Sequence, residues 1–174
     1  GNIARSFQGQ LLALGVGAGV GGMLKLAANA ETLQVQFEVL LGSAEAAKNK
    51  IKELKEFAAS TPFQISELGD ATKKLLFYKV SAEEVLPVLR QLGDVASLSG
   101  KPIGELAALY GKAKKNQRLF MDDITQLVEA GIPIYEVLNE QTGKQGEEIR
   151  KMVEAGKVGF PLLVDALNKA TGAG

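Results

Sequence analysis

Between residues 43 and 171, the chain is a succession of short segments in which apolar residues recur three and four positions apart. That spacing places the apolar residues on one face of an α-helix, so each segment predicts a short amphipathic helix. Thr61-Pro62 and Gly100-Lys101-Pro102 separate neighbouring segments, because proline disfavours helical angles before it and the glycine marks a turn. The sequence therefore predicts an all-α protein, a compact array of about seven short helices.

The expected helices have recognisable starts and buried faces. Ser43 and Ser66 are candidate N-caps, and Ser81 with Glu84 forms the S-x-x-E pattern of a capping box. Pro87 lies inside the third of these helices and should kink or restart it. Phe57, Phe63 and Phe77 are expected in the core. The other predicted core residues are Ala47, Ile51, Leu54, Ala58, Leu68, Ala71, Leu75, Tyr78, Val85, Val88, Leu89, Leu92, Val95, Ile103, Leu106, Ala107 and Tyr110.

Two later segments resemble each other, DDITQLVEAG at 122–131 and EEIRKMVEAG at 147–156. Each has two acids in its first turn, which suits the helix dipole, and a glycine at its C-terminal cap. A further apolar helix follows each copy, from Ile134 and from Phe160. The pattern predicts a helix–turn–helix hairpin duplicated at an offset of 25 residues, although two copies are too few for a solenoid.

The N-terminal region is rich in glycine and alanine, and no side chain between Leu11 and Leu24 is polar. These fourteen residues are fewer than the roughly 20 that a membrane-spanning helix needs. Gly15, Gly17, Gly19 and Gly21 form two overlapping G-x-x-x-G pairs, which allow helix backbones to approach closely. The segment is therefore expected to be an apolar helix that packs against copies of itself or enters a bilayer.

A dinucleotide-binding loop is the alternative for the same glycines. The run from Gly17 to Gly22 fits G-x-G-x-x-G, and Glu38 stands near the distance expected of a ribose-binding carboxylate. Glu38 lies in LQVQFEVLL, residues 33–41, where alternating polarity is compatible with one strand. One strand cannot make a doubly wound sheet, so packing or membrane contact is favoured and no cofactor is expected.

Charge and composition narrow the possible chemistry. The chain has 20 basic and 20 acidic residues, no histidine and no cysteine, which excludes disulfides, thiolate nucleophiles, the usual zinc sites and histidine-dependent catalysis. Acid–base chemistry would have to rest on Asp, Glu, Lys or Tyr. We predict no catalytic, cofactor-binding or metal-binding residue. The start at Gly1 without methionine suggests a fragment or a processed product, and no signal peptide is evident.

Three charged clusters have a structural and a functional interpretation. Lys112, Lys114, Lys115 and Arg118 could contact phosphates, but a solvated helix end is the favoured interpretation. LVEAGIPIYEVL has the length of a DNA-binding helix–turn–helix, but Glu136 and Glu140 of its second helix would repel the DNA. The adjacent pairs Asp122/Asp123 and Glu147/Glu148 suit helix N-termini better than a metal site or an acid–base pair.

Five ordered blocks resemble the N-terminal domain of the tape measure proteins of long-tailed bacteriophages and prophages. The resemblance covers about residues 31–170. The blocks are FEVLLGSAEAA (37–47), ELKEFAASTPFQISEL (53–68), LGDVASLSGKPIGELAALYGK (92–112), QLVEAGIPI (126–134) and EEIRKMVEAGKVGFPLLVDAL (147–167).

The resemblance implies a structural protein of the phage tail and no enzyme. Tape measure proteins are long helical rods that set tail length, at 1.5 Å per helical residue, while tail-tube subunits assemble around them. Implied partners are tail tube and tail tip proteins, tail assembly chaperones and further copies, with transient membrane contact through the N-terminal segment during genome delivery. The implied locations are the lumen of the virion tail and, during assembly, the host cytoplasm.

The expected organisation is an apolar segment and connector (1–41), a tape-measure-like helical domain (42–171) and a short tail (172–174). Fully helical, the chain would reach only about 260 Å, so it is expected to be one module of a longer chain. Short helices interrupted by turns cannot themselves be the ruler. The alternatives are a helical DNA-binding module, with no specific nucleic acid expected, and a tail-associated wall hydrolase, for which the sequence shows no acid–base constellation.

Overall fold

The computed structural model describes residues 17–173, with side chains from residue 29 onward. Over these residues the fold is all-α, as predicted, and its only β-type pairing is one isolated bridge between Arg118 and Gly159. The described helices are α2 (Gly17–Leu41), α3 (Ala44–Ala59), α4 (Ile65–Phe77), α5 (Ala82–Ser99), α6 (Ile103–Asn116), α7 (Met121–Glu129), α8 (Ile134–Thr142), α9 (Glu147–Glu154) and α10 (Phe160–Thr171).

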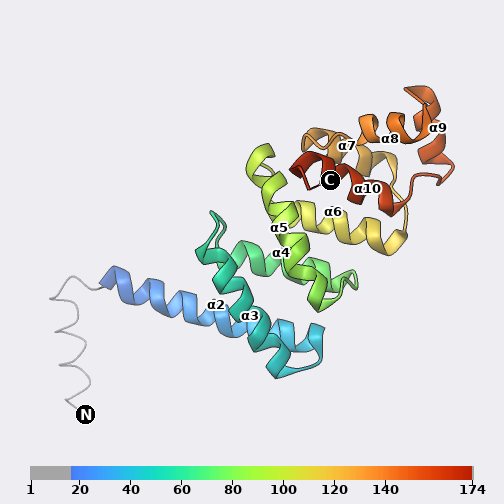
Figure 1. Ribbon diagram of the computed structural model, residues 1–174. Coiled ribbons are helices and arrows are strands. Elements are labelled where there is room, and N and C mark those ends of the chain that lie inside the picture. The colour runs from blue at the N-terminus through green and yellow to red at the C-terminus, as the bar shows by residue number, and fades with distance from the viewer. Residues whose placement is uncertain (1–16, 174) are drawn as a thin grey trace, which may run out of the picture.

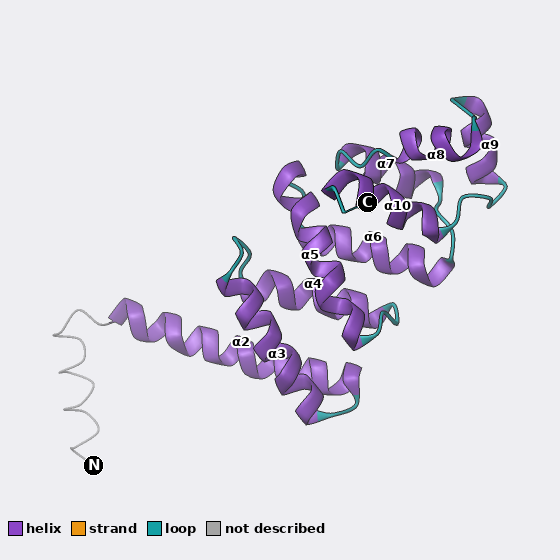
Figure 2. Ribbon diagram, in the orientation of Figure 1, coloured by secondary structure: helices purple, strands orange, loops and turns teal. Residues whose placement is uncertain are grey.

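The helices form an elongated array (Figures 1 and 2). α2, α3 and α4 lie at one end, α7 to α10 at the other, and α5 and α6 connect the two groups (Figure 1). The N-terminal end of α2 projects from the rest of the molecule, whereas its C-terminal half packs on α3 and α4. α4 packs along α6, and α10 packs on α5, α6 and α8, so each end is joined to the connecting helices.

One continuous apolar core runs through the array. The predicted core positions of α3, α4, α5 and α6 are buried, except that Ala58 is only partly buried and Tyr78 is half-buried. Phe57 and Phe63 are partly buried and pack against this core, as expected. Burying one leucine, isoleucine or valine side chain contributes about 1.5–3 kcal/mol, so the repeated stripes account for the fold without any disulfide or metal.

Residues 33–41 are helical, and the possible strand there was a wrong prediction. Phe37 is completely buried, and Leu33 and Leu41, four residues to either side of it, pack against the core. The apolar residues therefore follow the helical repeat, and the alternation in the sequence is incidental. Leu33 lies directly against Gly69 of α4, where an added Cβ would be 2.9 Å from the Leu33 methyl carbons. The missing side chain at Gly69 lets α2 and α4 approach closely.

Two further predictions, those for Ser66 and Phe77, need correction. α4 begins at Ile65 with Gln64 as its N-cap, because Glu67 accepts a hydrogen bond from the Gln64 backbone N–H at 2.8 Å; Ser66 therefore lies inside the helix. Phe77 is 65% exposed and not in the core, since the neighbouring Leu76 occupies the buried face. α5 continues through Pro87 from Ala82 to Ser99, so of the two effects expected of this proline a restart does not occur, and a kink stays a prediction.

The two predicted hairpins are confirmed as α7–α8 and α9–α10. Beside α2, the described residues form eight helices, α3 to α10, where about seven short helices were predicted beside an N-terminal one. The predicted boundary between residues 41 and 42 falls at the turn between α2 and α3, where Gly42 has a φ of 70°; the domain division itself stays a prediction. None of the helices described in residues 17–173 is long and apolar enough to cross a membrane.

Candidate functional site

The glycine motif forms helix and not a nucleotide-binding loop. Gly17 to Gly22 are in the first turns of α2, and residues 14–16 lie outside the described residues. The dinucleotide-binding motif requires a loop between a strand and a helix in a parallel sheet. Residues 17–173 contain no such sheet, so the glycine run lacks the setting in which it would bind a pyrophosphate.

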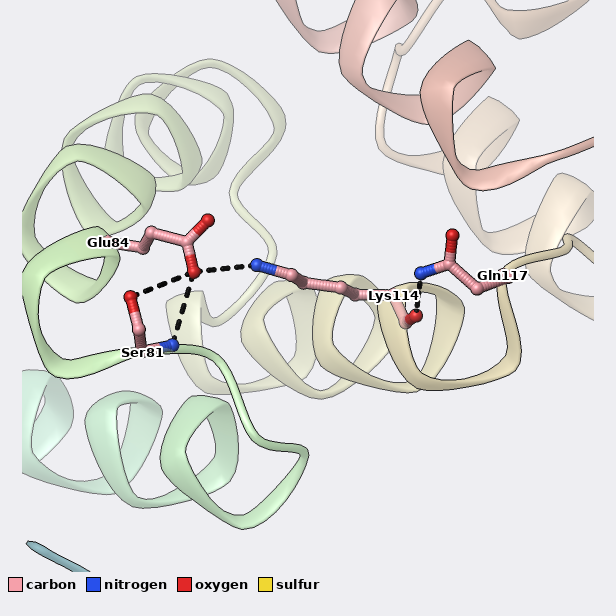
Figure 3. Close-up of polar contacts among 4 residues, drawn as sticks. All are labelled: Ser81, Glu84, Lys114 and Gln117. Carbon is pink, nitrogen blue, oxygen red and sulfur yellow. Dashed lines mark hydrogen bonds and ion pairs between the residues drawn. The ribbon is translucent and has the colours of Figure 1, made fainter.

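The basic cluster at the end of α6 is largely engaged in contacts within the protein. Lys114 Nζ lies 2.7 Å from Glu84 Oε2, which also accepts hydrogen bonds from the backbone N–H and the hydroxyl of Ser81 (Figure 3). The Gln117 side-chain amide donates to the backbone carbonyl of Lys114 (Figure 3). Glu84 is thus both the capping-box residue of α5, as predicted, and the link from α5 to α6.

The charge of Glu84 is stabilised by its partners. The Lys114 ammonium, followed by the Ser81 N–H and hydroxyl, lowers the pKa of the Glu84 carboxyl below its ordinary value. Burial raises the pKa of Tyr110 on α6, and the negative charge of Glu84 adds to this effect. A carboxylate held in its charged form by a lysine suits a structural link better than proton transfer near neutral pH.

Arg118 links the end of α6 to the second hairpin. Its guanidinium lies over the Phe120 ring, 4.3 Å from the centroid, and Nη2 donates to the Val153 carbonyl of α9 at 3.1 Å. Arg118 Nε is buried without a hydrogen-bond partner. Beside it, the Leu119 N–H donates to the Val158 carbonyl at 2.9 Å. Because a cation at a helix C-terminus is favourable, Arg118 stabilises the end of α9.

The predicted carboxylate pairs lie in the first turns of their helices, as expected. Asp123 is 1% exposed, accepts from the Phe120 N–H at 2.8 Å and lies 3.2 Å from Lys112 Nζ, so it caps α7 and ties it to α6. On α8, Glu136 and Glu140 both contact Lys169 of α10, at 2.8 and 2.6 Å. In residues 17–173, no group of three or more carboxylates is placed to hold a metal ion.

A surface groove between α2 and α4 was not predicted. Its larger part, of about 820 Å³, is lined by all three N-terminal helices, including Leu33, Gln36, Lys55, Ile65, Asp70 and Lys73. A smaller part of about 400 Å³ shares Asp70 and Lys73 with it and adds Leu40, Lys74, Phe77 and Tyr78. We call the two parts together the α2–α4 groove. Its only signal in the sequence is the stripe Ser66, Asp70, Lys73 and Phe77, which shares one face of α4.

These features define a helical structural module, in which the polar groups near the hairpins cap helices and join them to one another. Residues 21–174 match the tape measure protein family. The chain belongs to this family, and it is therefore related to structural components of the bacteriophage tail.

The chain is also similar to the Mu-like prophage FluMu protein gp42 of Haemophilus influenzae, with 27% identity over 160 residues. The matched region covers 84% of this chain and 24% of that protein, so the chain spans about a quarter of the length of this relative. No solved structure matches the chain significantly.

Proposed function

We propose that the chain is an assembly module of a longer tape measure protein and not the part that measures length. The observation that carries the proposal is the succession of turns. After α2, no described helix exceeds 18 residues, and the chain changes direction at every junction (Figure 1). A ruler needs uninterrupted helix that advances 1.5 Å per residue, whereas these helices fold back on one another around a core.

The module is proposed to act by binding other tail components. Its partners would be tail tube and tail tip proteins, tail assembly chaperones and further copies of itself, in the host cytoplasm during assembly and in the tail lumen of the virion. In the same proposal, the glycine-rich segment of residues 1–30 contacts the host membrane during genome delivery. As a structural module the chain performs no reaction, so incubation with peptidoglycan should release no sugar or peptide.

An in-frame deletion of residues 44–171 from the full-length protein in its phage tests this proposal. Loss of an assembly module should abolish tails, or leave tails whose length is no longer controlled. The matched control deletes 128 residues from a long helical stretch elsewhere in the same protein, which should shorten the tail by about 190 Å. The proposal is wrong if deleting residues 44–171 gives intact, infectious tails that are themselves about 190 Å shorter.

A further inference from the structure

The α2–α4 groove has the shape and chemistry of a helix-binding site. On α2, the residues lining the groove recur with helical spacing, and Ala30, Leu33 and Leu40 are the apolar members. On α4, the stripe that ends at Phe77 forms the facing wall. Two helices whose stripes flank an apolar groove offer a third, amphipathic helix a place to bury its apolar face.

The charged residues of the groove favour an acidic occupant. Lys55, Lys73 and Lys74 contribute three ammonium groups, and Asp70 is the one carboxylate among the lining residues. Asp70 lies 3.1 Å from Lys74 Nζ and 4.0 Å from Lys73 Nζ, so a single carboxylate is shared between two lysines. A helix that presents apolar side chains flanked by carboxylates would be complementary to this surface.

The chain itself has a ridge of this kind on α2. Val35 is 60% exposed and Val39 is 79% exposed, and Glu31 and Glu38 lie beside them on the same helix. At 100° per residue, positions 35 and 39 lie on the side of α2 opposite the buried Phe37. This side borders the edge of the groove that Thr32 and Gln36 form, whereas Leu33 and Leu40 lie further round the helix. We call Glu31, Val35, Glu38 and Val39 the α2 ridge.

We propose that the α2 ridge of one copy of this chain docks into the α2–α4 groove of a second copy. The valines would pack on Leu33, Leu40 and Phe77, and the ridge carboxylates would approach the groove lysines. Because ridge and groove are different surfaces, the contact is heterologous, and each added copy leaves one ridge and one groove free. The contact therefore propagates into a ring or a filament.

The proposed function includes binding between copies of this chain. This inference rests on the proposed function in that one respect, because it names the two surfaces that would bind. The deletion experiment does not require it, so either idea can fail alone.

Complementation between two defective variants tests the contact. Val39→Asp disrupts the ridge and leaves the groove intact, whereas Phe77→Asp disrupts the groove and leaves the ridge intact. Both side chains are mostly exposed, so helicity by circular dichroism should be unchanged. In analytical ultracentrifugation, the unmodified chain should exceed its monomer mass of 18.4 kDa increasingly with concentration. Each variant alone should weaken self-association by about tenfold or more.

An equimolar mixture of the two variants should form a one-to-one dimer and nothing larger, because one intact ridge and one intact groove remain. The matched control is Leu98→Asp on α5, where the side chain is also 79% exposed but lies outside ridge and groove; it should behave like the unmodified chain. A charge swap tests the polar part: a Lys73→Glu chain should bind a Glu38→Lys chain more tightly than it binds the unmodified chain.

Several results would overturn the proposal. If residues 1–16 or nothing at all filled the groove, the unmodified chain would be monomeric at submillimolar concentration. If ridges paired with ridges, Phe77→Asp alone would still self-associate, and mixing it with Val39→Asp would form no dimer that contains both variants. Unchanged association of Val39→Asp would place the contact elsewhere on the molecule.

Discussion

At the end of α7, Val128 is 46% exposed, whereas Val153 at the matching position of α9 is 1% exposed. The two valines belong to the same tetrapeptide, Val-Glu-Ala-Gly, and the turns that follow are nearly identical. Gly131 and Gly156 have φ values of 74° and 71°. In both turns, the glycine N–H donates to the carbonyl of the valine, at 2.9 and 3.0 Å. The local sequence thus determines how each helix ends.

The buried face of each helix depends on its neighbours and not on the repeat. α7 buries Asp123, Ile124 and Leu127, whereas α9 buries Ile149 and Val153. Arg118 donates a hydrogen bond to the carbonyl of Val153 at the end of α9. Two copies of one motif can therefore form the same hairpin and still differ in which substitutions they tolerate.

The largest difference in stability between the two hairpins is expected when Val128 or Val153 is replaced by aspartate. Val153→Asp places a charge in the core and should destabilise the protein by about 3–5 kcal/mol. Val128→Asp changes an exposed position and should cost less than about 0.5 kcal/mol. Urea unfolding followed by circular dichroism measures both. Equal losses would show that the two faces are equally buried and would contradict the comparison.

The two turn glycines should differ by a smaller amount. Alanine at Gly131 meets only the cost of a left-handed conformation, about 1–2 kcal/mol. Alanine at Gly156 would in addition bring Cβ to 2.9 Å from Arg118 Nη1, which should cost about 1 kcal/mol more through the lost hydrogen bond to Val153. In an Arg118→Ala background this excess should disappear. An excess that persists there would rule out Arg118 as its cause.

The third difference is in how much the acidic residues in the first turns of α7 and α9 contribute to stability. Asp123→Ala removes a buried cap and should cost about 1–2 kcal/mol, whereas Glu148→Ala changes an exposed residue and should cost less than about 0.5 kcal/mol. The same unfolding measurements apply. If Glu148→Ala proved the more damaging change, the cap assignment would be wrong.

The smallest effect concerns the ion pair between Glu84 and Lys114 that links α5 to α6. Because the pKa of Glu84 is lowered in the folded protein, its stabilisation is complete at neutral pH and is lost as the pH falls through that lowered pKa. Glu84 is half exposed, so the loss should stay below about 1 kcal/mol. Lys114→Met should reduce this acid dependence, because it removes the ammonium that most lowers the pKa of Glu84. The assignment fails if Lys114→Met leaves the acid dependence intact.

Features set by neighbouring residues in the sequence could be predicted, and features set by distant ones could not. The caps at Ser43 and Ser81 and the helix end at Gly100 depend on a few adjacent residues and were predicted. The exposure of Phe77 depends on how α4 meets other helices, because Leu76 beside it is equally apolar. The α2–α4 groove was missed for the same reason, since Leu33 lies against Gly69, 36 positions further along the chain.

The most direct test of the central claim is tail length, measured by electron microscopy, in a phage whose tape measure protein carries residues 44–171 twice. If these residues form an assembly module outside the measuring segment, tails should keep their normal length. Tails longer by about 190 Å, or 1.5 Å for each duplicated residue, would show that this segment is itself part of the ruler.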